Sequence, residues 1–433
     1  MCESGPSLLP GDIDSELYRG HPTFFYFISS IWLNVFGKSV FSGHLFFMVS
    51  SVLFLLSVYL MSLKLSDKLA GLFAAACLAI NPYFLTQATF MLPEIMVGFL
   101  SLLTLYFYIQ KKIFWEVFFG TLLVLTKESG LVLVGSILLV DFIRIIAQFR
   151  SKSWIGHLAD FSFHLIPLVF VTSFFIIQKI KLGWFFFPEH MNMIELDWHK
   201  FWNKFSSIYH RTFENDGRAI FTYISVAVTI WLIIKKKLSS KETLFVGLSY
   251  TFFIFYLAFS ALNFFTTRYV LAFFPIYYLL FGFLLYKTFL NIPWISLPVI
   301  LIYGWIAIEA SSKTTSIGDT SLKFINVVNV HKEAIRYCEE ADYYDRIIST
   351  HFLMFFNFNN PYMGYRETDI RFKNIWHYNS EVKDLVIISS VERGKRAEEL
   401  EADETLALIK SFENDYAWCK IYQKKKKNES PKE

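Results

Sequence analysis

The sequence predicts a mainly α-helical integral membrane protein, in which a polytopic transmembrane helix bundle of about ten spans is followed by a small C-terminal α/β domain. Composition is the first reason: 54% of the 433 residues are apolar and 19% are aromatic, and only 18% are charged, against roughly 25% in soluble domains. The second reason is the distribution of these residues. Long apolar runs fill the chain up to about residue 311, and the remainder has the regular Lys, Glu and Asp content of a soluble domain.

The apolar runs give the positions of the spans. A helix of roughly 17 to 25 apolar residues crosses about 30 Å of hydrocarbon. Such runs, separated by charged or Pro/Asn-bearing breaks, lie near residues 41–63, 68–84, 93–110, 113–126, 130–149, 160–180, 218–234, 244–263, 268–288 and 293–310. The fourth run is short, so a tilted or partly buried helix is expected there.

We expect four parts along the chain. Residues 1–40 form an external loop and an interfacial helix, residues 41–312 form the bundle with an external loop at 181–217, residues 313–424 form a soluble external domain, and residues 425–433 form a charged tail.

The pattern of the soluble domain predicts alternating strands and helices, typical of a doubly wound layer. It gives a helix at 321–341, strands at 344–352 and 382–390, a charged helix at 396–412 and a closing strand at 416–424. No Gly-rich phosphate fingerprint follows either early strand. An accessory role is therefore expected, either in acceptor binding or in capping the active face.

The cations in the connections predict the orientation. Alternate connections contain "SLKLSDK", "QKK", "RSKSW" and "KKKLSSK", and such Lys- and Arg-rich connections face the cytoplasm. The N-terminal segment, the 181–217 loop and, after ten spans, the C-terminal domain then lie outside. The expected location is the inner (cell) membrane of a bacterium.

Ionisable residues gather at the predicted external ends of the spans. Such residues at membrane depth are costly and are kept mostly for function, although a cation at a membrane boundary is often only an anchor. In "TKESG", Lys127 and Glu128 interrupt two apolar runs with hardly any loop between them. Lysine there can neutralise a lipid phosphate, and glutamate can orient the lysine or a substrate hydroxyl; a plain charged turn is the alternative. The other candidates are Asp12, Asp14, His21, Glu94 and Arg268.

Four strings in order resemble the GT-C glycosyltransferases of the dolichyl-phosphate-mannose protein mannosyltransferase and ArnT-like type. They are "GHPTFFYFISSIWLNVFGKS", "NPYFLTQATFMLPEIMVGFLSLLTLYFY", "LTKESGLVLV" and "TTRYVLAFFPIYYLLFGFLLY". The first resembles the family's His-Pro stretch, which starts an interfacial helix. The second is similar to an external loop whose acidic residue enters a span, the third to a Lys-bearing turn, and the fourth to an "RY…P" span. Together they cover roughly residues 15 to 290.

The resemblance implies a transferase that takes a sugar from a polyprenyl-phosphate-linked donor on the outer face of the membrane. The acceptor is a lipid, a glycan or a protein, no nucleic acid is involved, and a divalent cation is allowed for. A carboxylate would act as the general base, and cations would stabilise the lipid phosphate that leaves. The candidate bases are Asp14, Asp12 and Glu94, and the candidate substrate-binding residues are His21, Lys127, Glu128, Arg268 and Tyr269.

The chain departs from this family at its start. In the family, the acidic base follows a first transmembrane helix and precedes the His-Pro by some tens of residues, and this chain begins too late to contain that helix. We therefore hypothesise an N-terminally truncated or mis-started chain; otherwise the chain is inactive, or Glu94 and Asp14 have taken over. A lipid-linked glycan flippase or transporter, an O-antigen polymerase or ligase, and a non-catalytic membrane subunit are the alternatives.

Overall fold

A computed structural model describes residues 5–13, 18–149, 154–194, 196–288, 293–314, 316–360, 363–377, 384–391 and 395–425. The chain divides into two compact units. The first contains residues 1–37 and 42–312, and the second contains residues 38–41 and 313–433.

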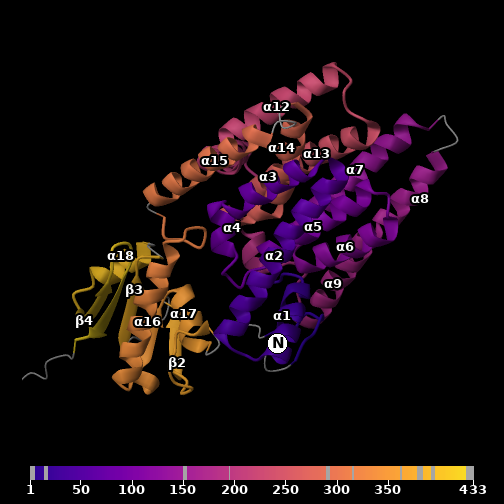
Figure 1. Cartoon of the computed structure of the whole chain (residues 1–433). Coiled ribbons are helices and arrows are strands. Elements are labelled where there is room, and N and C mark those ends of the chain that lie inside the picture. The colour runs from indigo at the N-terminus through magenta and orange to yellow at the C-terminus, as the bar shows by residue number, and fades with distance from the viewer. Residues whose placement is uncertain are drawn as a thin grey trace, which may run out of the picture. The chain divides into compact units, whose positions relative to one another are not determined.

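The first unit is a bundle of helices (Figure 1). In chain order its elements are α1 (Phe24–Phe36), α2 (Val40–Leu65), α3 (Lys68–Ala79), α4 (Pro82–Gln87), α5 (Glu94–Ile109), α6 (Ile113–Thr126), η1 (Glu128–Gly130), α7 (Leu131–Ala147), α8 (Trp154–His164), α9 (Ile166–Leu182), α10 (Pro188–Met191), α11 (Trp198–Tyr209), η2 (His210–Glu214), η3 (Asn215–Gly217), α12 (Arg218–Ile234), α13 (Ser240–Leu262), η4 (Thr267–Ala272), α14 (Phe274–Thr288) and α15 (Pro293–Lys313). Each of the ten apolar runs contains one or two of these helices, so the predicted helix bundle is confirmed.

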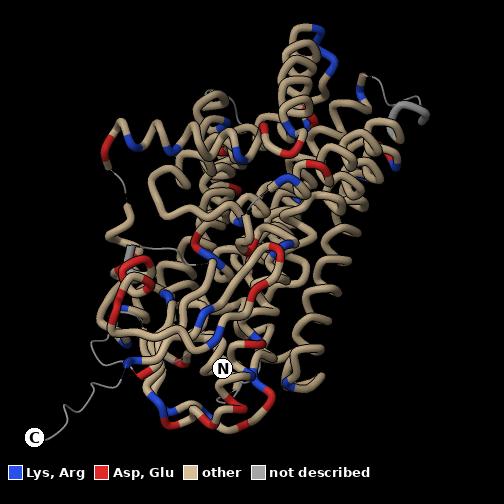
Figure 2. Tube along the Cα trace, turned by 90° about the vertical axis from the view of Figure 1, so that its left-hand side faces the viewer, with Lys and Arg blue, Asp and Glu red and all other residues tan. Residues whose placement is uncertain are grey.

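Within the described residues, five helical stretches are long and apolar enough to cross a membrane. They are Val40–Leu65, Glu128–Ala147, Trp154–Leu182, Trp198–Ile234 and Ser240–Leu262, and shorter apolar helices at Phe24–Phe36, Lys68–Ala79, Glu94–Ile109 and Ile113–Thr126 accompany them. Figure 2 shows long stretches of these helices without a charged residue. The apolar lengths are therefore built mostly from side chains that need no partner in hydrocarbon.

Local sequence explains where several helices begin. Asp67 caps α3 by accepting from the amide of Leu69, and Asn81 caps α4. Ser239 and Glu242 form a reciprocal capping box at the start of α13. Each cap satisfies amide donors that the first helical turn leaves without an intrahelical partner. These helices therefore start at the polar breaks between the apolar runs.

Packing brings α5 to the centre of the site described below. α5 packs along α6, and α6 packs in turn along α9. The element η4 also lies against α5, and Gly98 makes this approach close, since a Cβ at this position would lie 2.6 Å from the carbonyl oxygen of Leu271. The small residue at position 98 thus lets η4 reach the helix that begins with Glu94.

The second unit is an α/β domain with a five-stranded sheet. Its elements are α16 (Phe324–Glu340), η5 (Tyr343–Asp345), β1 (Ile347–Thr350), α17 (Phe352–Asn359), β2 (Asn374–His377), β3 (Leu385–Ser389), α18 (Lys395–Glu401), β4 (Leu406–Glu413) and β5 (Trp418–Lys424). The strand order is β2-β1-β3-β5-β4; β1 pairs in parallel with β2 and β3, and β5 pairs antiparallel with β3 and β4. The predicted α/β domain is confirmed.

In this domain one predicted helix is partly wrong, and the helix α17 and one strand were not predicted. The charged helix expected at 396–412 ends at Glu401, and residues 406–413 form β4 instead. This segment pairs with β5, with an irregularity between Leu408 and Lys410. Strand pairing outweighed the helical preference of the charged residues, as tertiary context often does. The short strand β2 had no counterpart in the prediction.

A buried histidine makes the stability of this domain depend on pH. His331 on α16 accepts at Nδ1 from the amide of Asn357 over 3.2 Å. Burial, and the neighbouring His351, hold the pKa of His331 well below its usual value of 6.5. The unfolded chain therefore binds a proton below about pH 6.5 that the folded domain does not bind, so the free energy of unfolding should decrease as the pH falls through this value.

Hydrogen exchange at the α16 amides of the full-length protein in detergent, corrected for intrinsic rates, measures this effect. We expect a smaller opening free energy at pH 5 than at pH 7.5, and a weaker pH dependence in His331→Gln. His377→Gln changes an exposed histidine on β2 and should keep the wild-type dependence. An unchanged dependence in His331→Gln would contradict the assignment.

Candidate functional site

An ion pair joins the start of α5 to the end of α6. The two helices are connected by a short turn and pack side by side, so Glu94 and Lys127 come to the same end of the pair. Lys127 follows the last residue of α6 in an extended conformation (φ −160°, ψ 141°). Its Nζ donates to Glu94 Oε1 over 3.0 Å, and both side chains are buried. Each charge thus has a partner in a place where an isolated charge would be costly.

A second cation reaches the same carboxylate. Arg268 lies on η4, and its Nε donates to Glu94 Oε1 over 3.3 Å. The next residue is Tyr269. The centre of its ring lies 3.5 Å from Lys127 Nζ, which is a cation–π contact. The hydroxyl of Tyr256 donates to the backbone oxygen of Tyr269 over 2.7 Å and fixes this turn. Two cations therefore converge on Glu94, and an aromatic ring lies against one of them.

A small pocket lies among these side chains. It is lined by Glu94, Val97, Lys127, Ser129, Tyr256, Tyr269 and Ala272. Its polar groups are the Lys127 ammonium, the Glu94 carboxylate and the hydroxyls of its tyrosines and serine. α5 and η4 supply its apolar wall. The space among these side chains is too small to hold a water molecule, but its cations are already positioned to stabilise negative charge that develops nearby.

His21 and Glu128 form a second pair directly beside Lys127. The Nδ1 of His21 lies 2.9 Å and 3.0 Å from the two carboxylate oxygens of Glu128. The ring of His190, from α10 in the 181–217 loop, lies 5.3 Å from the His21 ring. Burial, and next the neighbouring His21, lower the pKa of His190. From sequence, His190 is one of several histidines in the 181–217 loop, and nothing in its local pattern shows that the loop folds back to His21.

Tyr18 and Gln178 hold the segment that carries His21. The hydroxyl of Tyr18 contacts the backbone oxygen of His21 over 3.1 Å and also bonds Gln178 on α9. Burial raises the pKa of Tyr18, so this hydroxyl keeps its proton. Gln178 donates in turn to the backbone oxygen of Phe185 over 2.6 Å. The His21 segment and the 181–217 loop are thus tied to one helix.

The structure brings together six of the eight candidates, which are His21, Glu94, Lys127, Glu128, Arg268 and Tyr269. The described contacts of Asp12 lie elsewhere: it bonds the Ser7 hydroxyl and lies 3.8 Å from Lys181 Nζ. Asp14 is outside the described residues. In the part of the chain that the structure describes, no group of three or more His, Cys, Asp and Glu side chains could hold a metal ion. The divalent cation stays a prediction.

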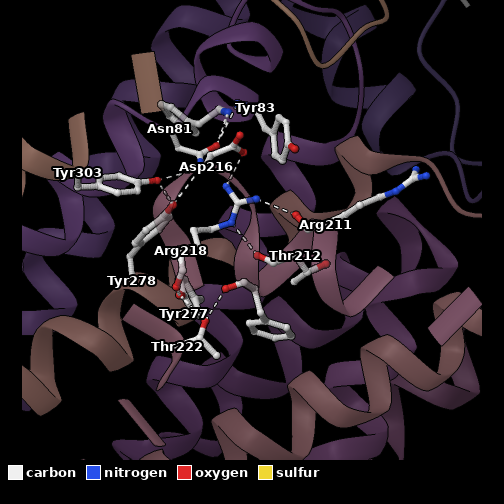
Figure 3. A network of polar contacts seen from close by, with 12 residues as sticks. Asn81, Tyr83, Arg211, Thr212, Asp216, Arg218, Thr222, Tyr277, Tyr278 and Tyr303 are labelled. Atoms are coloured by element: carbon white, nitrogen blue, oxygen red, sulfur yellow. Dashed lines mark hydrogen bonds and ion pairs between the residues drawn. The ribbon is translucent and has the colours of Figure 1, made fainter. Parts of the chain in front are cut away.

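Sequence reasoning missed a buried arginine at the start of α12. Arg218 is fully buried, and its guanidinium lies 2.9 Å from Asp216 (Figure 3). It also donates to the backbone oxygens of Thr212 and Arg211, each over 2.7 Å, and its guanidinium carbon lies 5.3 Å from the centre of the Tyr83 ring. Arg218 therefore fastens the end of the 181–217 loop to the bundle. In the sequence it looks like any cation beside an apolar run.

Two further clusters of polar side chains lie in the bundle, one beside Arg218 and one at the opposite ends of α5 and α6. Next to Arg218, Asn81 donates to the hydroxyls of Tyr278 and Tyr303 over 2.9 Å and 3.3 Å (Figure 3). At the far ends of α5 and α6, His164 lies 2.5 Å from Asp141 and 3.1 Å from Glu116. Single acidic residues within apolar runs were the available signal for this second cluster.

Removing the Arg218 side chain should destabilise the bundle. Arg218→Met leaves Asp216 and two backbone oxygens without their donor, and breaking a buried pair in this way costs about 3–5 kcal/mol. We expect a clear fall in the melting temperature of the detergent-solubilised protein. Arg211→Met is the matched control, because the exposed Arg211 side chain points away from the network in Figure 3. Equal melting temperatures for the two variants would contradict the role of Arg218.

Comparisons with known proteins place the fold. Residues 20–176 match the family model described as dolichyl-phosphate-mannose-protein mannosyltransferase. No curated protein sequence matches the chain. Two crystal structures of ArnT from Cupriavidus metallidurans, one bound to undecaprenyl phosphate and one in the apo state, match with a TM-score of 0.57. They are 12% and 11% identical, and each alignment covers 93% of this chain and 88% of the other.

In fold, this chain is similar to a GT-C type membrane glycosyltransferase, as the four sequence strings predicted. Within that class it has the fold of ArnT. The matched segment contains His21, Glu94, Lys127 and Glu128, whereas Arg268 and Tyr269 lie beyond it.

Proposed function

We propose that this chain transfers a sugar from a polyprenyl-phosphate-linked donor to an acceptor hydroxyl at the outer face of the membrane. The observation that carries the proposal is the convergence of Lys127 and Arg268 on one carboxylate, Glu94. The sequence match to a mannosyltransferase family and the fold of ArnT, which was crystallised with undecaprenyl phosphate, support it.

The charges in this cluster suit a lipid phosphate. Lys127 and Arg268 carry two positive charges and Glu94 one negative charge, so the three side chains together have a net charge of +1. A sugar phosphodiester carries one negative charge and gains a second when the sugar leaves. Cations that are already in place stabilise this developing charge without reorganising during the reaction. Tyr269, stacked on the Lys127 ammonium, keeps that cation in position.

The same contacts bear on the choice of base. A general base needs a carboxylate that readily takes a proton. Glu94 accepts from two cations, which stabilise its ionised form. In this proposal Glu94 therefore organises the cations and another group acts as the base; Asp12 and Asp14 are the acidic candidates that the sequence offers for it.

The proposed orientation places the Glu94 cluster, the external loop and the C-terminal domain outside, and the protein in a bacterial inner membrane. The Lys- and Arg-rich connections support this orientation. Its acceptor is a lipid, a glycan or a protein that presents a hydroxyl group at the outer face.

Removal of either cation should impair transfer. In Lys127→Ala and Arg268→Ala, we expect transfer from a labelled polyprenyl-phosphate sugar to fall about 10²- to 10³-fold, the usual effect of removing one electrostatic stabiliser. Labelled donor added to native membranes, followed by separation of the labelled products, measures the change.

Lys200→Ala and Arg211→Ala are matched controls, because both remove a cation from the exposed part of the external loop. They should retain transfer. Normal transfer in both site variants would reject the phosphate-binding role. If the protein moves the donor across the bilayer and transfers nothing, the flippase alternative is correct.

Cysteine labelling tests the orientation. In a variant whose native cysteines are replaced by alanine, Asn192→Cys should react with a membrane-impermeant maleimide in intact cells, because it lies in the external loop. Lys237→Cys, in the connection between α12 and α13, should react only after the membrane is opened. Labelling of position 237 in intact cells would mean that the proposed orientation is wrong.

A further inference from the structure

We infer that His21 is the general base of the proposed transfer and that Glu128 holds it in the reactive tautomer. The inference rests on the proposed function. It assigns to His21 and Glu128 a role in proton transfer, which is different from binding the donor phosphate.

The geometry of the pair defines the tautomer. Both carboxylate oxygens of Glu128 lie within 3.0 Å of His21 Nδ1. A carboxylate only accepts hydrogen bonds, so Nδ1 must carry a proton. In the neutral ring the basic lone pair is then on Nε2. A carboxylate behind a histidine orients the ring and stabilises the imidazolium that forms when the base takes a proton.

The side chains of the pair are partly exposed. The side chains of His21 and Glu128 are 19% and 31% exposed, whereas Glu94 is only 4% exposed. The described acidic candidates are less suited to the task, because Glu94 is held by two cations and Asp12 bonds Ser7 and faces Lys181. His21 thus combines a basic atom with access.

Several contacts fix the His21 backbone. Tyr18 bonds its carbonyl oxygen and is itself tied to α9. The preceding residue, Gly20, has φ +78°, and a Cβ there would lie 2.9 Å from atoms of both Trp184 and Phe187. Only glycine satisfies this conformation and this close approach. The segment is therefore held against the external loop, as a positioned base requires.

The pair also lies next to the phosphate-binding cations. Glu128 directly follows Lys127 in the chain, and Lys127 bonds Glu94. Tyr26 on α1 is within electrostatic range of Lys127, Glu94 and Glu128. Glu128, which holds the proposed base His21, is thus the chain neighbour of the cation Lys127, so base and cations belong to one site.

The step balances as follows. His21 Nε2 takes the proton of the acceptor hydroxyl, and the acceptor oxygen forms a bond to the anomeric carbon of the donor sugar. The bond between that carbon and the phosphate oxygen breaks, and its electron pair leaves with the polyprenyl phosphate, whose charge Lys127 and Arg268 stabilise. The imidazolium, paired with Glu128, later releases its proton to water.

The experiment separates chemistry from donor binding in the full-length protein in native membranes, with labelled polyprenyl-phosphate sugar as the probe. His21→Gln should reduce turnover about 10²- to 10⁴-fold, the usual contribution of general base catalysis, with little change in donor affinity. Glu128→Gln should give a smaller loss in turnover. Lys127→Ala should instead weaken donor binding as well.

A pH profile distinguishes a base from a structural residue. The wild-type rate should fall on the acidic side as His21 becomes protonated, and this limb should disappear from the residual rate of His21→Gln. Among the described residues, Glu128, His190 and Tyr18 contact His21 directly, and Lys127 and Glu189 act on these neighbours. His190→Gln should therefore shift the limb without removing it.

The external loop offers a matched control. His210 and Glu214 on η2 form a second histidine–glutamate pair, and His210→Gln and Glu214→Gln should retain turnover and the pH profile. If the wild type and both controls transfer sugar and His21→Gln does so at the same rate, the base assignment is wrong and the proposed function stands. If the wild type transfers nothing and binds no donor, both are wrong.

Discussion

The site depends on one carboxylate in an apolar surrounding. Glu94 accepts from Lys127 and Arg268, and in doing so it joins the start of α5, the end of α6 and η4. Without it, two like charges would lie side by side in a region where desolvation of each is expensive. The Glu94 carboxylate offsets the desolvation cost of burying two cations, so both can be held in position. Gly98, one helical turn further along α5, supports the same arrangement, because it lets η4 approach closely enough for Arg268 to reach.

The ionisable groups of the bundle occur in compensated clusters at helix ends. One end of α5 and α6 has Glu94 and Lys127, and the other has Glu116 with its partner His164. α6 is therefore bonded to its neighbours by ionisable side chains near both of its ends, with apolar residues between. A helix held in this way has little freedom to slide, so Lys127 and Glu128 remain in place at its end. Pairing of this kind is what hydrocarbon demands of any charge that enters it.

The sequence was most informative where a single chain segment contains the signal. Apolar length alone predicted the helical runs, and "TKESG" identified Lys127 and Glu128 because charges between two apolar runs are conspicuous. Signals that depend on a distant partner were not visible. Arg218 reads as an ordinary boundary cation until Asp216 and the carbonyls of η2 are seen to enclose it. The strand β4 was predicted as a helix because only its pairing with β5 distinguishes it.

The 181–217 loop links the His21 segment to the start of α12. Its early part places His190 beside His21, and Gln178, just before it, holds both Tyr18 and Phe185. Its last residues are fastened by Arg218 to the bundle. In the proposed transfer, a loop that is secured at both ends and holds His190 beside His21 restricts how an acceptor approaches His21. In the described interactions, Arg218 contacts none of the candidate residues. The loop links Arg218 to His21, so substitutions at Arg218 should alter the position of His190 at the site.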